Sequence, residues 1–92
     1  MKKEERMELA DFFKAFSHQT RINIVNLLRV KKEMDFSELV DSTEFSMSTI
    51  SEHLKFLTKT GVIKKTDRQK NGAVLFFVDE NLISKVFNGF SR

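Results

Sequence analysis

The segment from Ser46 to Gly61 concentrates side chains that could contact a nucleic acid. At helical spacing, one face carries small hydroxyls, a carboxylate and lysines: Ser48, Thr49, Ser51, Glu52, Lys55 and Lys59. Small hydroxyls can approach base edges and phosphates in the DNA major groove, and lysines neutralise the charge of the DNA backbone. The simpler alternative is an amphipathic surface helix whose polar face only meets water.

Apolar residues in the same segment predict the helix that would present this face. They recur at i, i+3, i+7 and i+10 and form one stripe: Met47, Ile50, Leu54 and Leu57. Ser46 can cap the start of a helix, and Gly61 can end one. We therefore expect a short helix over residues 47–60.

Two β-prone runs follow this helix, at residues 62–68 and 73–78. Asn71-Gly72 lies between them, and this pair suits a type I′ hairpin turn, which needs φ > 0 at both central residues. Four cations lie close to the turn: Lys64, Lys65, Arg68 and Lys70. A helix followed by a hairpin with a basic tip is the order of a winged helix-turn-helix, whereas a generic α+β domain has no need of cations there.

The remaining segments predict the surrounding helices. The first and last helices each carry a wide apolar stripe, formed by Leu9, Phe12, Phe13 and Phe16 and by Ile83, Val86, Phe87 and Phe90. We also expect a core helix from Thr20 to about Lys32, a short helix from Phe36 to about Ser42, and Asp79 as the cap of the last helix. The predicted fold class is mainly α with a small β-hairpin (α+β), in the order α-α-α-α-β-β-α, with residues 1–92 forming one domain.

From about Leu9 to Phe90 the chain resembles the ArsR-type (arsenic-repressor-like) winged-helix transcriptional regulators. Residues 13–21 (FKAFSHQTR) resemble the segment that enters that family's second helix, and residues 46–55 (SMSTISEHLK) resemble its recognition helix. Gly61-Val-Ile63 and the paired Phe76-Phe77 agree as well. The resemblance implies a homodimeric repressor that binds palindromic operator DNA and is released by an effector.

The resemblance also bears on the two phenylalanine-rich stripes. In this family the first and last helices form the dimer interface, and the stripes carry more apolar surface than one small domain readily covers. We favour the same interface here over burial within one chain. Its expected residues are Leu9, Phe12, Phe13, Phe16, Ile83, Val86, Phe87 and Phe90.

The chain departs from the family at the positions where metal-sensing members bind their ions. Such members commonly carry a cysteine pair where this sequence has Asp35 and Ser37, and others use histidine ligands on the last helix, where residues 80–92 contain none. Since the chain has no cysteine, we expect no thiolate metal site, no redox switch and no cofactor. A hard-cation site made of carboxylates, a small organic effector, a protein partner and no effector at all remain open, so the effector is unknown.

The two histidines do not have the spacing of a metal site. We expect His53 to be half-buried and hydrogen-bonded within the helix-turn-helix, and His18 to shape the entrance to the second helix. No glycine-rich phosphate loop or nucleophile with an adjacent base is visible, so we do not expect an enzyme.

Composition adds further limits. The net charge of this 92-residue chain is only +3, so attraction to DNA must depend on where the cations lie. The sequence shows neither a signal peptide nor a segment long enough to span a membrane, and a cytoplasmic location is the simplest expectation.

We expect a homodimeric regulator whose central helix enters the major groove of double-stranded DNA, while the hairpin tip contacts the minor groove or backbone. The expected DNA-binding residues are Ser46, Ser48, Thr49, Ser51, Glu52, Lys55, Arg68, Lys70 and Asn71. Glu52 either reads a base or pairs with a nearby lysine along the helix. The alternative function is a winged-helix protein-interaction module that has lost DNA binding, which Glu52 and the low net charge would favour.

Overall fold

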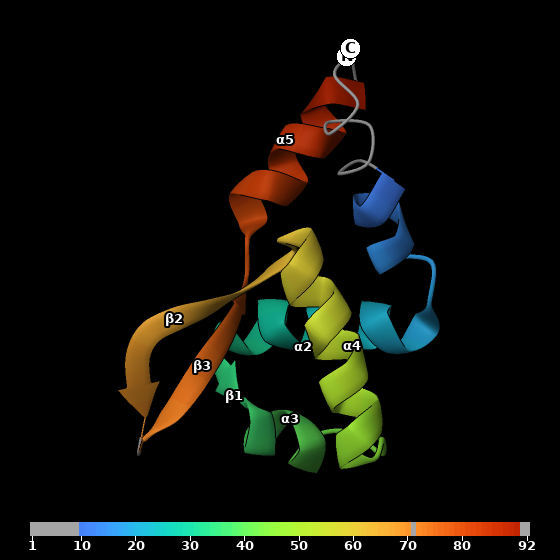
Figure 1. The fold of residues 1–92 in the computed structure, drawn as a ribbon. Coiled ribbons are helices and arrows are strands. Elements are labelled where there is room, and N and C mark those ends of the chain that lie inside the picture. Colours follow the sequence, from blue (N-terminus) through green and yellow to red (C-terminus); the bar gives the residue numbers. More distant parts are fainter. Residues whose placement is uncertain (1–9, 71, 91–92) are drawn as a thin grey trace.

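The computed structural model describes residues 10–70 and 72–90, and the side chains of residues 67–70, 87, 89 and 90 are outside this description. Residues 10–15 are helical. The elements that follow are α2 (Gln19–Lys31), β1 (Met34–Asp35), α3 (Phe36–Asp41), α4 (Met47–Thr60), β2 (Ile63–Lys70), β3 (Ala73–Val78) and α5 (Glu80–Phe90). The structure is thus mostly helical with a small antiparallel sheet, as the sequence predicted (Figure 1).

The sheet has three strands in the order β1-β3-β2. Strands β2 and β3 form the predicted hairpin, in which Ile63 pairs with Val78 and Lys70 pairs with Ala73. Gly72 has φ +80°, the left-handed conformation that such a tight turn requires. Strand β1 was not predicted, because it is only two residues long and exists through pairing of Met34 with Phe76 rather than through a local pattern.

Capping residues set the ends of α4 as expected. The Ser46 side chain accepts a hydrogen bond from the Thr49 backbone N–H, and Gly61 ends the helix with φ +87°. One residue of the predicted apolar stripe differs: Met47 is 64% exposed. It occupies the first position of the helix, one turn before Ile50, and so lies beyond the edge of the core.

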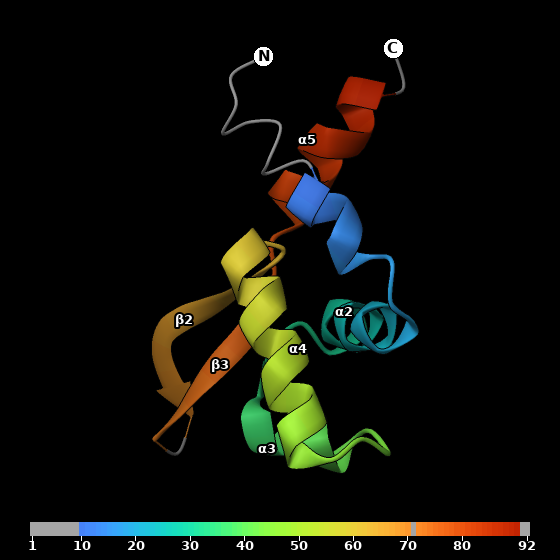
Figure 2. The ribbon, with the colours of Figure 1, turned by 45° about the vertical axis from the view of Figure 1, so that its right-hand side comes forward.

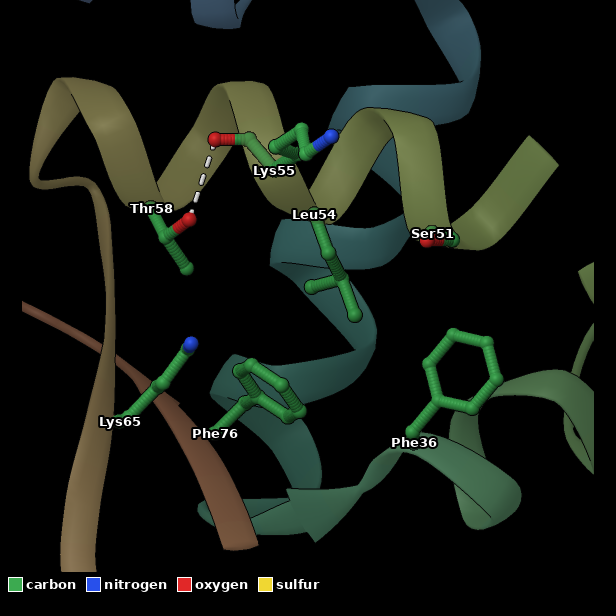
Figure 3. Close-up of a pocket in the computed structure, with 7 residues that line it drawn as sticks. All are labelled: Phe36, Ser51, Leu54, Lys55, Thr58, Lys65 and Phe76. Atoms are coloured by element: carbon green, nitrogen blue, oxygen red, sulfur yellow. Dashed lines mark hydrogen bonds between the residues drawn. The ribbon is translucent and has the colours of Figure 1, made fainter. Parts of the chain in front are cut away.

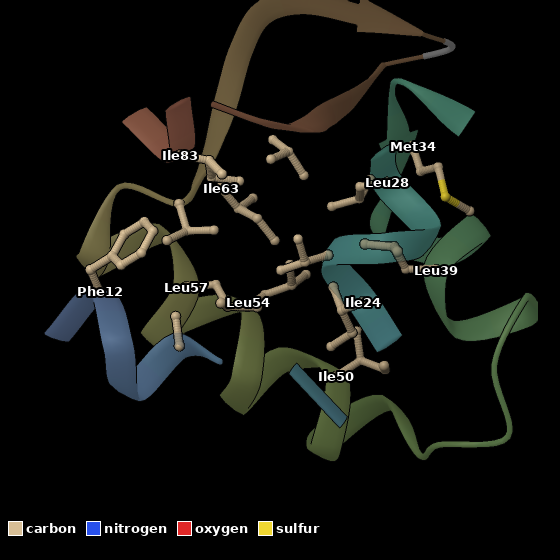
Figure 4. Close-up of a cluster of buried hydrophobic side chains, with 14 residues drawn as sticks. Phe12, Ile24, Leu28, Met34, Leu39, Ile50, Leu54, Leu57, Ile63 and Ile83 are labelled. Atoms are coloured by element: carbon tan, nitrogen blue, oxygen red, sulfur yellow. The ribbon is translucent and has the colours of Figure 1, made fainter. Parts of the chain in front are cut away.

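The core forms where α2 and α4 pack on each other and on the base of the hairpin (Figure 4). Its fully buried large side chains come from α2, α3, α4 and β2 and include Ile24, Leu28, Leu39, Ile50, Leu57 and Ile63. This cluster removes one side of α4 from solvent, so the opposite side of the helix must face outwards. Burial of the stripe therefore fixes which residues of α4 can meet a partner.

The helix over residues 10–15 lies at the same end of the molecule as α5 in both views (Figures 1 and 2). Two of the residues expected at a dimer interface are already buried inside one chain at this end, namely Phe12 (2% exposed) and Ile83 (8%). Phe13 is 46% exposed, and Phe16 and Val86 are partly buried. Leu9 and the side chains of Phe87 and Phe90 are outside the described residues.

Candidate nucleic-acid interface

The N-terminal end of α4 carries a cluster of three hydroxyls. Ser46 Oγ donates a hydrogen bond to Thr49 Oγ1 (2.9 Å) and lies 3.3 Å from Ser48 Oγ. Ser46 is committed to capping the helix, while the Thr49 hydroxyl hydrogen is not used in the Ser46 contact. Exposed hydroxyls at the positive end of a helix dipole are suited to contact phosphates or base edges.

The next turn of α4 presents Ser51, Glu52 and Lys55, all of which are exposed. Glu52 makes no ion pair with any residue that the structure describes, although Lys55 and Lys59 are on the same helix. The alternative role of Glu52 as half of a helix-surface ion pair is therefore not observed in these residues. Its carboxylate is exposed and can meet a donor outside the chain.

A cleft of about 220 Å³ separates α4 from the hairpin (Figure 3). Ser51, Lys55 and Thr58 line it from α4, Lys65 from β2, and Phe36, Leu54 and Phe76 form its apolar part. Neither Lys55 nor Lys65 has a carboxylate within 4.0 Å among the described residues. The two ammonium groups thus remain available to an anion that approaches between α4 and the β2–β3 hairpin.

Lys65 was not among the predicted contact residues, although it belongs to the basic run of the hairpin. Successive side chains of a strand point to opposite faces, and the two neighbouring lysines of β2 differ in this way. Lys64 Nζ lies 2.7 Å from Asp79 Oδ2, on the side away from the cleft. This hydrogen bond lowers the pKa of Asp79 below its ordinary value of 3.8, against the opposing effect of burial. Lys64 is therefore engaged within the chain, and Lys65 faces the cleft.

The predicted contacts at the hairpin tip fall outside this geometry. Strand β2 ends at Lys70, and β3 begins at Ala73. The side chains of Arg68 and Lys70, and all of Asn71, are outside the described residues. Their roles stay predictions.

Both histidines lie where α4 meets α2. His53 is half-buried and accepts a hydrogen bond from Arg21 Nε at 3.2 Å, as predicted for this residue. His18 is the cap of α2, and its Nδ1 accepts from the Thr20 backbone N–H. Burial, followed by the charges of His18 and Arg21, lowers the pKa of His53 below 6.5, while Glu52 opposes the shift.

Asp35, one of the two residues that stand where the family has metal-binding cysteines, has a structural role here. Asp35 caps α3: its Oδ1 accepts from the Glu38 backbone N–H at 2.8 Å, and Glu38 Oε1 accepts from the Asp35 N–H at 3.0 Å. This reciprocal pair is a capping box.

Within residues 10–70 and 72–90, no three His, Cys, Asp or Glu side chains gather into a group that could hold a metal ion. In the same ranges no helix is both long and apolar enough to cross a bilayer.

A family model matches the part of the chain from the cap of α2 to the start of β2, which includes α3 and α4. The model is described as bacterial regulatory protein, arsR family, and it covers residues 18–65, just over half of the chain. The chain belongs to the ArsR family. This family consists of regulatory proteins, which agrees with the resemblance seen in the sequence and with a regulator of transcription that binds DNA.

Individual relatives of this ArsR-family chain agree with the assignment. The cadmium resistance transcriptional regulatory protein CadC homolog of Staphylococcus aureus is 30% identical over 89 residues, which cover 92% of this chain and 72% of the relative. An ArsR-like transcriptional regulator from Rhodococcus sp. RHA1 has a similar structure, with a TM-score of 0.84, 23% identity and coverage of 97% and 81% of the two chains. The homodimeric winged helix-turn-helix DNA-binding domain of a possible ArsR-family regulator from Mycobacterium bovis gives a TM-score of 0.74 at 17% identity, with coverage of 99% and 84%.

Proposed function

We propose that this ArsR-family protein is a homodimeric repressor that acts in the cytoplasm by binding a palindromic operator in double-stranded DNA. Helix α4 enters the major groove and the hairpin tip contacts the adjacent minor groove or backbone. Ser48, Thr49 and Ser51 make close groove contacts, and Ser46 orders the end of the helix that they occupy. Glu52 discriminates between bases. Lys55, Arg68 and Lys70 bind phosphates, and Asn71 contacts DNA from the hairpin tip.

The observation that carries this proposal is the polar face of α4, which is exposed and faces a cleft containing Lys55 and Lys65. A buried stripe on the other side fixes the rotation of the helix, so the same residues always face outwards. Lysines with no described carboxylate partner lose little when they bind phosphate, because no internal ion pair has to break. We therefore add Lys65 to the predicted phosphate contacts.

The proposed dimer joins the helix over residues 10–15 and α5 of one protomer to their copies. Phe13 supports this interface, since it is a large apolar side chain left 46% exposed beside the partly buried Phe16. The homodimeric state of the Mycobacterium bovis domain supports it independently. A two-fold axis between the protomers would place two α4 helices on half-sites about one turn of DNA apart, roughly 34 Å, which is why the operator should be palindromic.

In vitro selection from a random duplex library, followed by footprinting, tests this function. We expect the enriched sequences to contain an inverted repeat and the footprint to be symmetric, with two protomers bound per duplex. Failure to enrich any sequence would favour the protein-interaction module instead. Enrichment of a single half-site bound by one protomer would leave DNA binding in place and overturn the dimer.

A further inference from the structure

Arg21 connects three helices through one guanidinium group. Its Nη1 donates to the Lys14 carbonyl oxygen at 2.8 Å, and its Nε donates to His53 Nδ1 at 3.2 Å. Its Cζ lies 3.9 Å from the centre of the Phe56 ring. Arg21 is in the first turn of α2, Lys14 is near the end of the N-terminal helix, and His53 and Phe56 are on α4, so this side chain bridges elements that are distant in sequence.

The contact with Lys14 is favourable because of where that carbonyl lies. The last carbonyls of a helix form the negative end of its dipole. The Lys14 carbonyl oxygen accepts there from the Ser17 backbone N–H at 3.1 Å and from the Ser17 hydroxyl at 2.8 Å as well as from Arg21. The guanidinium supplies both a donor and a positive charge at this point. The orientation of the N-terminal helix relative to α2 is thereby linked to the position of the Arg21 side chain.

The contact with α4 is directional as well. A donor reaches His53 Nδ1, so that nitrogen carries no proton and the neutral ring holds its hydrogen on Nε2. The His18 ring lies against His53, with 4.6 Å between ring centres. The Arg21 guanidinium lies over the Phe56 ring and thereby contacts the same helix one turn further on. Two contacts a turn apart restrain both the rotation and the tilt of α4 from the flank of the helix, between its buried stripe and its polar face.

We propose that Arg21 is a positioning residue for DNA recognition, which sets the angle of α4 against the N-terminal helix by holding the Lys14 carbonyl, His53 and Phe56 together. This inference rests on the proposed function, because it assigns a role in operator binding. Protonation of His53 removes the acceptor that Arg21 uses. The charged or titratable groups that face His53 are His18, Arg21 and Glu52, and the first two oppose protonation. The hydrogen bond from Arg21 to His53 should therefore hold at neutral pH and be lost in mild acid, which would release α4.

The first part of the test compares Arg21→Ala with Arg29→Ala on two DNAs, the selected operator duplex and a random duplex, at the same salt. Arg29 is a matched control, since it is also on α2 but pairs with Glu80 and is half-exposed. We expect Arg21→Ala to weaken operator binding about tenfold, which is the effect of one lost base contact. It should weaken random-duplex binding no more than Arg29→Ala does. Thermal unfolding identifies a variant that has simply lost its fold, and Arg21→Lys, which keeps the charge but not the planar fork, then replaces Arg21→Ala.

The second part uses His53 variants. Asn offers a carbonyl oxygen close to the position of Nδ1 and does not titrate, whereas Leu offers no acceptor. We expect the wild type to lose operator affinity as the pH falls below 6.5, the ordinary pKa of histidine. His53→Asn should keep its operator affinity over the same pH range. His53→Leu should weaken operator binding as Arg21→Ala does, and the double variant should weaken it no further.

The possible outcomes separate the two proposals. If the wild-type protein selects no duplex, the proposed function fails and this inference fails with it. If the wild type selects an operator but Arg21→Ala and His53→Leu have additive effects, or Arg21→Ala affects both duplexes as Arg29→Ala does, only the positioning role is overturned. If His53→Asn still loses operator affinity in acid, the proton-dependent release of α4 is overturned as well.

Discussion

At the scale of single residues, the least expected side chain on the recognition face is Glu52. Phosphates repel a carboxylate, so Glu52 lowers affinity for every DNA unless it finds a donor. The amino group of cytosine is such a donor in the major groove. The absence of an ion pair between Glu52 and the described lysines makes this role more favourable, because the carboxylate is free to meet a base.

Glu52→Ala should raise affinity for random duplexes while it abolishes the preference at one operator position, a loss of about 1–3 kcal/mol of discrimination. Glu52→Gln is the matched control, because it removes the charge and keeps the shape. Competition binding of operator and random duplex at one salt concentration measures both effects. Equal shifts for the two DNAs, with an unchanged preferred sequence, would show that Glu52 is only a surface charge.

His53 supplies a second prediction at this scale, for stability rather than binding. Its pKa in the folded protein is lowered by burial first and then by His18 and Arg21. The unfolded chain therefore takes up a proton more readily, so stability is complete above pH 6.5 and declines as the pH falls from 6.5 towards the folded-state pKa. Urea unfolding between about pH 7.5 and 5.5 should show this decline in the wild type and a smaller one in His53→Asn. Parallel curves for the two proteins would contradict the assignment.

At the scale of elements, cap chemistry predicts more than periodicity does. Ser46 and Gly61 define the ends of α4 because their local hydrogen bonds and backbone angles do not depend on the rest of the fold. Met47 continues the apolar spacing but is exposed, since the core ends before the first turn of the helix is reached. Spacing indicates which residues share a face, and only the packed structure determines how much of that face is covered.

Tertiary contacts could not be predicted in the same way. The alternation of β2 separates Lys64 from Lys65, but nothing local says which of them faces α4. Strand β1 depends on its partner β3, and the Arg21–His53 contact joins residues 32 positions apart. The polar face of α4 was therefore predictable from the sequence of that helix alone. The cleft between α4 and the hairpin and the Arg21–His53 contact were not.

The hairpin gives a prediction at this scale. If Arg68 and Lys70 bind phosphates, each change to alanine should weaken binding to all duplexes similarly and reduce the slope of log K against log salt by about one. Arg29→Ala removes the same charge from α2 and should leave the slope unchanged. Titrations at several salt concentrations measure it. If the double variant Arg68→Ala/Lys70→Ala keeps the wild-type slope, the hairpin tip does not contact the backbone.

At the scale of the whole molecule, the terminal helices and the recognition helix should act together through the dimer. The exposed Phe13 allows a direct test, because it is not part of the buried core, unlike its neighbour Phe12. Phe13→Asp should leave the chain folded but place unpaired charges in the interface, where each costs several kcal/mol. Analytical ultracentrifugation should then find a monomer, and specific operator binding should be lost.

Val30→Asp is the control for this change. Val30 is 75% exposed on α2, so the same charge is introduced at a site outside the proposed interface and the dimer should persist. A dimeric Phe13→Asp protein with normal operator binding would show that the interface lies elsewhere. A Val30→Asp protein that is also monomeric would show that the effect is not specific to the Phe13 surface.

Recognition of DNA by α4 is tested most directly by the binding of the wild-type protein to its selected duplex and to a random duplex across a range of salt concentrations. We predict that both affinities fall linearly on a log–log scale, because lysines and arginines displace counterions from the phosphates. We also predict that the selected duplex binds at least about 10³-fold more tightly at physiological salt, as expected when α4 reads bases. Binding that is absent at low salt, or equal for the two duplexes, would contradict recognition of DNA by the exposed face of α4.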